Sequence, residues 1–228
     1  MDKRILLIPL ALVAAVIAAV VIIGPLVYSA VAAPKDQDPF SLPTASSAPG
    51  ARTAAADNGI WTVADGSQAG YTVNEVLNGK DTAVIGRTDR VSGTATVKGG
   101  QLTAARLSVD ASKIATGNTG RDNYFRFTVI SAGKYPEATF ALASPVPLPE
   151  IGAGPTDLAL PGTLSLAGQT RAVTARIQAV REGARIAAAG SIPIEVRDFG
   201  IDPPNLGFVR VEDHAQVRFR VNLSPAAG

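Results

Sequence analysis

The chain has 228 residues, a formal net charge of +2 and no cysteine. Its basic residues are scattered among acidic ones, so it lacks the basic patch of a nucleic-acid-binding protein, and we expect no nucleic-acid partner. The absence of cysteine excludes disulfides, thiolate nucleophiles and cysteine-based metal sites.

The N-terminal part of the chain has the pattern of a membrane anchor. Residues 5–33 contain no charged residue, and residues 5–23 are aliphatic apart from Pro9. As a helix, residues 5–23 would extend about 28 Å, close to the thickness of the hydrocarbon core of a bilayer. Lys3 and Arg4 precede this run, so the positive-inside rule predicts a cytoplasmic N-terminus and an extracytoplasmic remainder.

A cleaved signal peptide is the alternative, because residues 30–32 read Ala-Val-Ala, an A-x-A cleavage site. The apolar core of a signal peptide is usually about 7–15 residues long, and this one is longer. We therefore expect a retained single-pass anchor over residues 1–33. Residues 34–58 are rich in Pro, Ser, Ala and Thr, with only Phe40 and Leu42 as large apolar residues, which predicts a flexible stalk.

Residues 59–228 are predicted to form one all-β domain, because apolar and polar residues alternate along most of this region. Residues 210–223 have one apolar and one polar parity, the pattern of a long half-buried strand. The apolar row is Val211, Ala215, Val217, Phe219, Val221 and Leu223. Further strands are predicted at residues 61–63, 69–77, 82–97, 105–109, 137–143, 158–166, 173–179 and 186–194.

About eight strands with mostly hairpin connections favour an antiparallel barrel, since closure leaves no exposed edge strand. A barrel of this size is filled by side chains or holds one small ligand. Small inward residues such as Ala175, Ala179 and Ala188 favour an interior that is not completely filled. A sandwich of two sheets is the alternative, and periodicity does not separate the two. Residues 145–155, rich in Pro and Gly, are predicted to form a loop.

The most distinctive segment is residues 116–127, where turn-forming Gly and Asn residues precede a charged pair and a group of aromatic residues. These are Arg121 and Asp122, followed by Tyr124, Phe125 and Phe127. One interpretation is that Asp122 lies in the first turn of a short helix, near the positive end of its dipole. The other is that the segment crosses the mouth of the barrel as a lid over a ligand cavity.

The sequence gives little support for catalysis. His214 is the only histidine, and it falls on the polar parity of the last strand, where a solvated residue is expected. A lone histidine without cysteine does not build a structural zinc site, and no nucleophile-elbow, metalloprotease, P-loop or dinucleotide-binding motif occurs. We therefore expect a protein without enzymatic activity, metal or tightly bound cofactor.

Short motifs in residues 59–223 resemble those of the YceI-like family of polyisoprenoid-binding, lipocalin-like proteins. They are residues 60–63 (Ile-Trp-Thr-Val), Thr116-Gly-Asn with Arg121-Asp122, residues 134–140 (Lys-Tyr-Pro-Glu-Ala-Thr-Phe), residues 162–170 (the G-x-L-x-L-x-G-x-T turn) and residues 197–201 (Arg-Asp-Phe-Gly-Ile). Two departures lie near the expected mouth: residues 123–125 replace a His-Leu pair that the family often has, and residues 127–133 alter an aromatic-rich segment.

The resemblance implies an eight-stranded antiparallel barrel, in an extracytoplasmic location, that holds a long isoprenoid chain such as a polyprenyl or quinone tail. With this family in view, the residues expected at the lipid cavity and its mouth are Trp61, Tyr71, Arg121, Asp122, Tyr124, Phe125, Phe127, Phe140 and Phe199. Arg121 could hold a diphosphate or quinone head, or it could form an ion pair with Asp122 or Asp198.

The function that we expect is that of a membrane-tethered, extracytoplasmic lipid-binding protein, which could also pair as a homodimer. The alternative is a non-catalytic interaction module of the cell envelope. Its barrel or sandwich would be packed solid by aromatic residues such as Trp61, Phe140, Phe199 and Phe219.

Overall fold

The computed structural model describes residues 38–42, 58–205 and 209–226. The predicted anchor over residues 1–33 lies outside these ranges, as does the predicted stalk apart from residues 38–42 and 58. Within the described part of the chain, no helix is both long enough and apolar enough to cross a membrane. The chain divides into two compact units, residues 1–38 and 39–228, and the following paragraphs concern the second unit.

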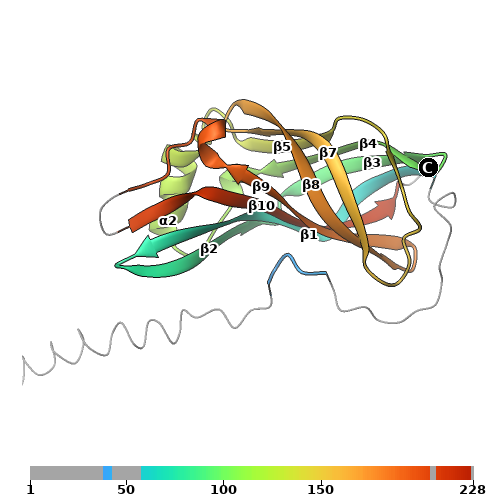
Figure 1. Cartoon of the computed structure of the whole chain (residues 1–228), viewed down its shortest axis with the longest axis horizontal. Coiled ribbons are helices and arrows are strands. Elements are labelled where there is room, and N and C mark those ends of the chain that lie inside the picture. Colours follow the sequence, from blue (N-terminus) through green and yellow to red (C-terminus); the bar gives the residue numbers. More distant parts are fainter. Residues whose placement is uncertain (1–37, 43–57, 206–208, 227–228) are drawn as a thin grey trace, which may run out of the picture. The chain divides into compact units, whose positions relative to one another are not determined.

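The second unit is built almost entirely of antiparallel strands (Figure 1). The strands are β1 (Gly59–Leu77), β2 (Lys80–Thr88), β3 (Val91–Lys98), β4 (Gln101–Asp110), β5 (Glu137–Leu142), β6 (Val146–Pro147), β7 (Thr156–Leu166), β8 (Gln169–Glu182), β9 (Arg185–Glu195) and β10 (Val209–Pro225). A helix, α2 (Thr119–Tyr124), lies in the segment between β4 and β5, and a π-helical turn (Phe125–Val129) continues it. Two 3-10 helices, Ala111–Lys113 and Val196–Phe199, complete the elements.

The strands close into a barrel, because β10 pairs with β1 as well as with β9. The ring runs β1, β10, β9, β8, β7, β5, β4, β3 and back to β1. Strand β2 pairs with residues 69–77 of β1, and β3 pairs with residues 59–62 of the same strand. Consequently β2 and β3 are two parts of one interrupted side, and the barrel has eight sides. The predicted antiparallel barrel is confirmed, and the two-sheet alternative is wrong.

Alternation along β10 explains which face of this strand is buried. Ala215, Phe219 and Val221 of the predicted apolar row are buried, whereas Glu212 and Gln216 on the other parity are exposed. The two strands predicted at residues 61–63 and 69–77 are one strand, β1. The Asp-Gly sequence between them produces a register shift against β10 instead of a chain reversal.

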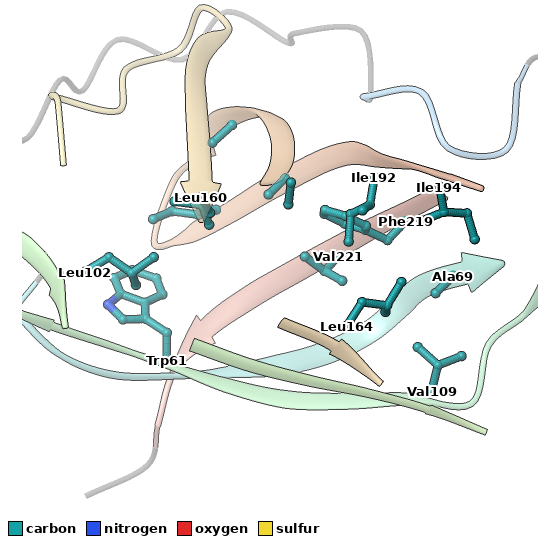
Figure 2. Packing of buried hydrophobic residues seen from close by; sticks show 14 of the residues in the cluster. Trp61, Ala69, Leu102, Val109, Leu160, Leu164, Ile192, Ile194, Phe219 and Val221 are labelled. Atoms are coloured by element: carbon teal, nitrogen blue, oxygen red, sulfur yellow. The ribbon is translucent and has the colours of Figure 1, made fainter. Parts of the chain in front are cut away.

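The hydrophobic residues form one large cluster inside the barrel and a smaller one beneath the segment between β4 and β5. In the large cluster, Trp61 and Leu102 lie at one end and Val109 and Ile194 toward the other (Figure 2). The smaller cluster contains Ala111, Ile114, Ile130 and Ala132. This second cluster fixes the helical segment against Tyr71 of β1, Ala138 of β5 and Leu166 of β7 at one end of the barrel.

Candidate binding cavity

The barrel interior contains a cavity of about 160 Å³ with an almost entirely apolar lining. Every side of the barrel contributes to this lining. The residues include Trp61 and Ala69 of β1, Val97 of β3, Leu102 and Val109 of β4, Phe140 of β5, Leu160 and Leu164 of β7, Ala175 and Ala179 of β8, Ala188 and Ile192 of β9, and Phe219 and Val221 of β10. The packed-solid interior of the alternative interpretation is therefore not observed.

Small side chains on neighbouring strands explain why space is left. Ala175 and Ala179 of β8 and Ala188 of β9 are buried and line the cavity. Next to them Gly190 pairs with Phe219, and a Cβ on Gly190 would lie 2.8 Å from the Phe219 ring and 2.4 Å from the Arg176 carbonyl oxygen. The aromatic ring thus covers a glycine, and the methyl side chains of the three alanines leave space beside it.

A loop closes the end of the barrel at which Trp61 lies. Residues 143–155 contribute Leu148 and Ile151 to the cavity lining. Within the loop, Leu148 N donates to the Gly100 carbonyl oxygen at 2.9 Å. The buried Arg181 side chain donates through Nε to the Ile151 carbonyl oxygen at 3.0 Å, and Arg181 N donates to Gly152 O at 2.7 Å. Sequence reasoning missed this role, although two large apolar residues among Pro and Gly were a usable signal.

The segment that was expected to cross the mouth packs on inward-facing residues at one end of the barrel, among them Tyr71, which shares the parity of the cavity-lining Ala69. Phe125 stacks on Tyr71 of β1, with ring centroids 4.9 Å apart and planes inclined by 25°. Gly86 of β2 lies directly against the Tyr71 ring, since a Cβ there would be 2.5 Å from it. No side chain of residues 111–135 lines the cavity. The segment meets the barrel interior through Val129, which packs against both hydrophobic clusters.

Arg121 forms an ion pair, but its partner is Glu75 of β1 and not Asp122 or Asp198. Arg121 Nη2 lies 2.6 Å from Glu75 Oε1, and the Glu75 side chain is only 4% exposed. Asp122 instead accepts hydrogen bonds from Thr116 N at 2.8 Å and Thr116 Oγ1 at 2.7 Å. Sequence reasoning missed this partner. The usable signal was that Glu75, a carboxylate, shares the parity of the apolar residues Tyr71 and Val73 of β1.

Burial dominates the electrostatics of this corner. It raises the pKa of Tyr71 to about 12, because the phenolate would lose its hydration. The positive charge of Arg121 opposes this shift, whereas Asp122 and Glu75 add to it. The phenol therefore stays neutral, and the corner holds one ion pair between strand β1 and helix α2.

The residues expected at the cavity and mouth fall into separate places. Trp61 and Phe140 line the cavity. Phe199 is buried in the main cluster, next to the last strand, but outside the cavity lining. Tyr71, Phe125, Arg121 and Asp122 belong to the corner between β1 and α2 just described, and Tyr124 and Phe127 are 40% and 68% exposed. The assignment of these nine residues to a ligand site stays a prediction.

Ionisable groups elsewhere do not gather into a metal site among the described residues, where no three His, Asp or Glu side chains come together. His214 is exposed, as expected from its parity, and its Nδ1 lies 3.0 Å from Glu195 Oε1. Asp213, which interrupts the apolar row of β10, lies 3.3 Å from Arg197 Nε. These contacts join β10 to the end of β9 and to the 3-10 helix Val196–Phe199.

An eight-sided antiparallel barrel around an apolar cavity is the architecture of small barrels that enclose a single ligand. The chain belongs to the YceI-like domain family, whose sequence model matches residues 61–223. This confirms the resemblance seen in the motifs. No match was found among curated proteins.

Solved structures with the same fold are distant in sequence. A polyisoprenoid binding domain from Saccharophagus degradans, implicated in plant cell wall breakdown, is 18% identical with a TM-score of 0.59, covering 73% of this chain and 98% of that one. BcnA from Burkholderia cenocepacia is 19% identical with a TM-score of 0.56, covering 68% and 95%. The YCEI protein of Campylobacter jejuni is 16% identical with a TM-score of 0.53, covering 64% and 87%. At these identities the likeness concerns the fold.

Proposed function

We propose that the protein binds one apolar lipid of isoprenoid type inside the barrel. The observation that carries this proposal is the apolar cavity bounded by all eight sides of the barrel. Binding an apolar chain there contributes roughly 25 cal/mol for each Å² removed from water, without requiring polar partners. The structurally similar domain described as polyisoprenoid binding supports the choice of an isoprenoid among apolar ligands.

The size of the cavity limits what the closed barrel can hold. Its volume of about 160 Å³ is close to the roughly 150 Å³ of an engineered cavity that binds benzene, and below the range of about 300–1,000 Å³ of typical ligand pockets. This space suits about one isoprene unit. A longer chain therefore requires the barrel to widen, with loop 143–155 as the part that opens.

The binding test compares two substitutions on strand β8. Ala175→Leu adds bulk inside the cavity, whereas Ala172→Leu adds the same bulk at an exposed position. The full chain, purified in detergent and delipidated, is mixed with farnesol and analysed by native mass spectrometry. We expect the bound complex in the wild type and in Ala172→Leu, and its loss in Ala175→Leu. Binding that survives Ala175→Leu, or no binding to the wild type, would contradict the proposal.

The proposed location is extracytoplasmic, with residues 1–33 as a retained anchor, residues 34–58 as the connection and residues 59–228 as the lipid-binding domain. The charge-free run after Lys3 and Arg4 supports this orientation. Because the chain lacks cysteine, Ala184→Cys in the exposed β8–β9 turn gives a single thiol. Labelling of intact cells by a membrane-impermeant maleimide is expected, and labelling only after lysis would contradict it.

A further inference from the structure

An aromatic residue that precedes the barrel strands in the sequence is buried against the outer face of the barrel. Phe40 lies in residues 39–42, well before β1, yet only 1% of its surface is exposed. Among the described residues it is the largest fully buried side chain, and it is more buried than Trp61 inside the barrel. A flexible stalk was expected here, and these residues lie against the barrel instead.

Phe40 lies in a groove that is formed by outward-facing residues of β7 to β10. Its lining includes Ala189 and Ser191 of β9, together with Arg176, Gln178 and Arg218. The Arg218 guanidinium lies over the Phe40 ring, 5.1 Å from its centroid, which is the geometry of a cation–π contact. Leu42 lines the same groove. Ala189 is only 8% exposed although it faces outward, as expected if the docked segment covers it.

We propose that residues 39–42 are a latch that docks in this groove and limits how far the barrel can move from its anchor. If residues 1–33 are the anchor, an undocked connection of residues 34–58 reaches at most roughly 85 Å, whereas residues 34–38 alone reach roughly 17 Å. Docking thus keeps the barrel within one short peptide of the membrane surface, from which an apolar ligand must be taken. The docking itself depends on neither the membrane nor the lipid, but the tether length rests on the proposed function.

Thiol labelling tests the docking. In the full chain in detergent, Ala189→Cys places the only thiol beneath the latch. We expect Phe40→Ala to accelerate its modification roughly tenfold or more, the change in accessibility expected when a buried Phe side chain is lost. Ala184→Cys, in an exposed turn, should react at the same rate with and without Phe40, and Phe127→Ala, which removes an exposed ring, should leave Ala189→Cys protected. Equal labelling of Ala189→Cys with and without Phe40 would overturn the latch.

Energy transfer tests the tether. A donor on Ala184→Cys and acceptors in the lipids of a nanodisc report the distance of the barrel from the bilayer. We expect lower transfer efficiency in Phe40→Ala than in the wild type, and no change in Phe127→Ala. Unchanged transfer in a chain whose latch has been released would overturn the tether role, whatever the outcome of the farnesol experiment. Loss of farnesol binding with an intact latch would contradict only the lipid proposal.

Discussion

Single residues decide how the helical segment is held against the barrel. Glu75 and Arg121 are separated by 46 positions and form the contact between strand β1 and helix α2. Tyr71 and Phe125 stack beside them, and Gly86 leaves room for the Tyr71 ring. Because a buried carboxylate is costly without its partner, the ion pair favours this one docking of the segment.

Replacing one member of this pair should cost more than replacing both. Arg121→Met leaves the buried Glu75 carboxylate unpaired, and we expect a loss of about 2 kcal/mol in unfolding free energy, since Arg121 is partly solvated. The double variant with Glu75→Met should recover most of this loss. Urea denaturation measures both values. A single variant as stable as the wild type would show that the pair does not hold the segment.

Tyr71 predicts a pH dependence at the alkaline end. Burial raises its pKa to about 12 in the folded protein, above the ordinary value of 10, so the folded state binds the proton more tightly than the unfolded state. The resulting stabilisation is complete below pH 10 and is lost as the pH rises toward 12, a change of about 2 kcal/mol. Tyr71→Phe, which keeps the ring, should lose less stability than the wild type over this interval. The same pH dependence of the unfolding free energy in the two proteins would contradict the assignment of this effect to Tyr71.

At the scale of elements, loop 143–155 is the part that we propose opens the cavity. It carries Leu148 and Ile151 into the cavity lining, but strand pairing in it is limited to the two residues of β6. Arg181 holds it from β8 by a side-chain and a backbone hydrogen bond. Few hydrogen bonds and a short strand are features of segments with low local stability.

Arg181→Ala should therefore loosen this loop while leaving the barrel closed. The backbone bond to Gly152 remains, so we expect a modest loss of about 1–2 kcal/mol and faster exchange of the Leu148 amide. Release of dansyl-labelled farnesol, followed by stopped-flow fluorescence, should accelerate about tenfold. Arg185→Ala, an exposed arginine in β9, is the matched control. Unchanged release despite faster amide exchange would place the opening elsewhere in the barrel.

At the scale of the molecule, local alternation was enough to predict the strands but not their neighbours. The row of β10 was predictable because all its residues except Asp213 have apolar side chains, whereas the closure of the barrel depends on β1 pairing with β10 more than a hundred residues away. Trp61 and Phe140 lie on locally readable strands and line the cavity, whereas the contacts of Glu75 and of loop 143–155 are made with residues far away in the sequence and were missed. Contacts set by strand register are not visible in a local pattern.

The interior volume finally predicts how affinity depends on chain length. Each additional buried CH₂ group contributes about 0.8 kcal/mol, but about 160 Å³ accommodates only roughly one isoprene unit. A rigid barrel would give similar affinities for geraniol, farnesol and geranylgeraniol, with 10, 15 and 20 carbons. We expect instead that affinity rises along this series, because the methyl-lined wall at Ala175, Ala179 and Ala188 and the loop beside Ile151 can move apart. Isothermal titration calorimetry should show an increasingly negative heat-capacity change as more apolar surface is buried. A constant affinity from geraniol onward would mean that the barrel does not widen and that its ligand is short.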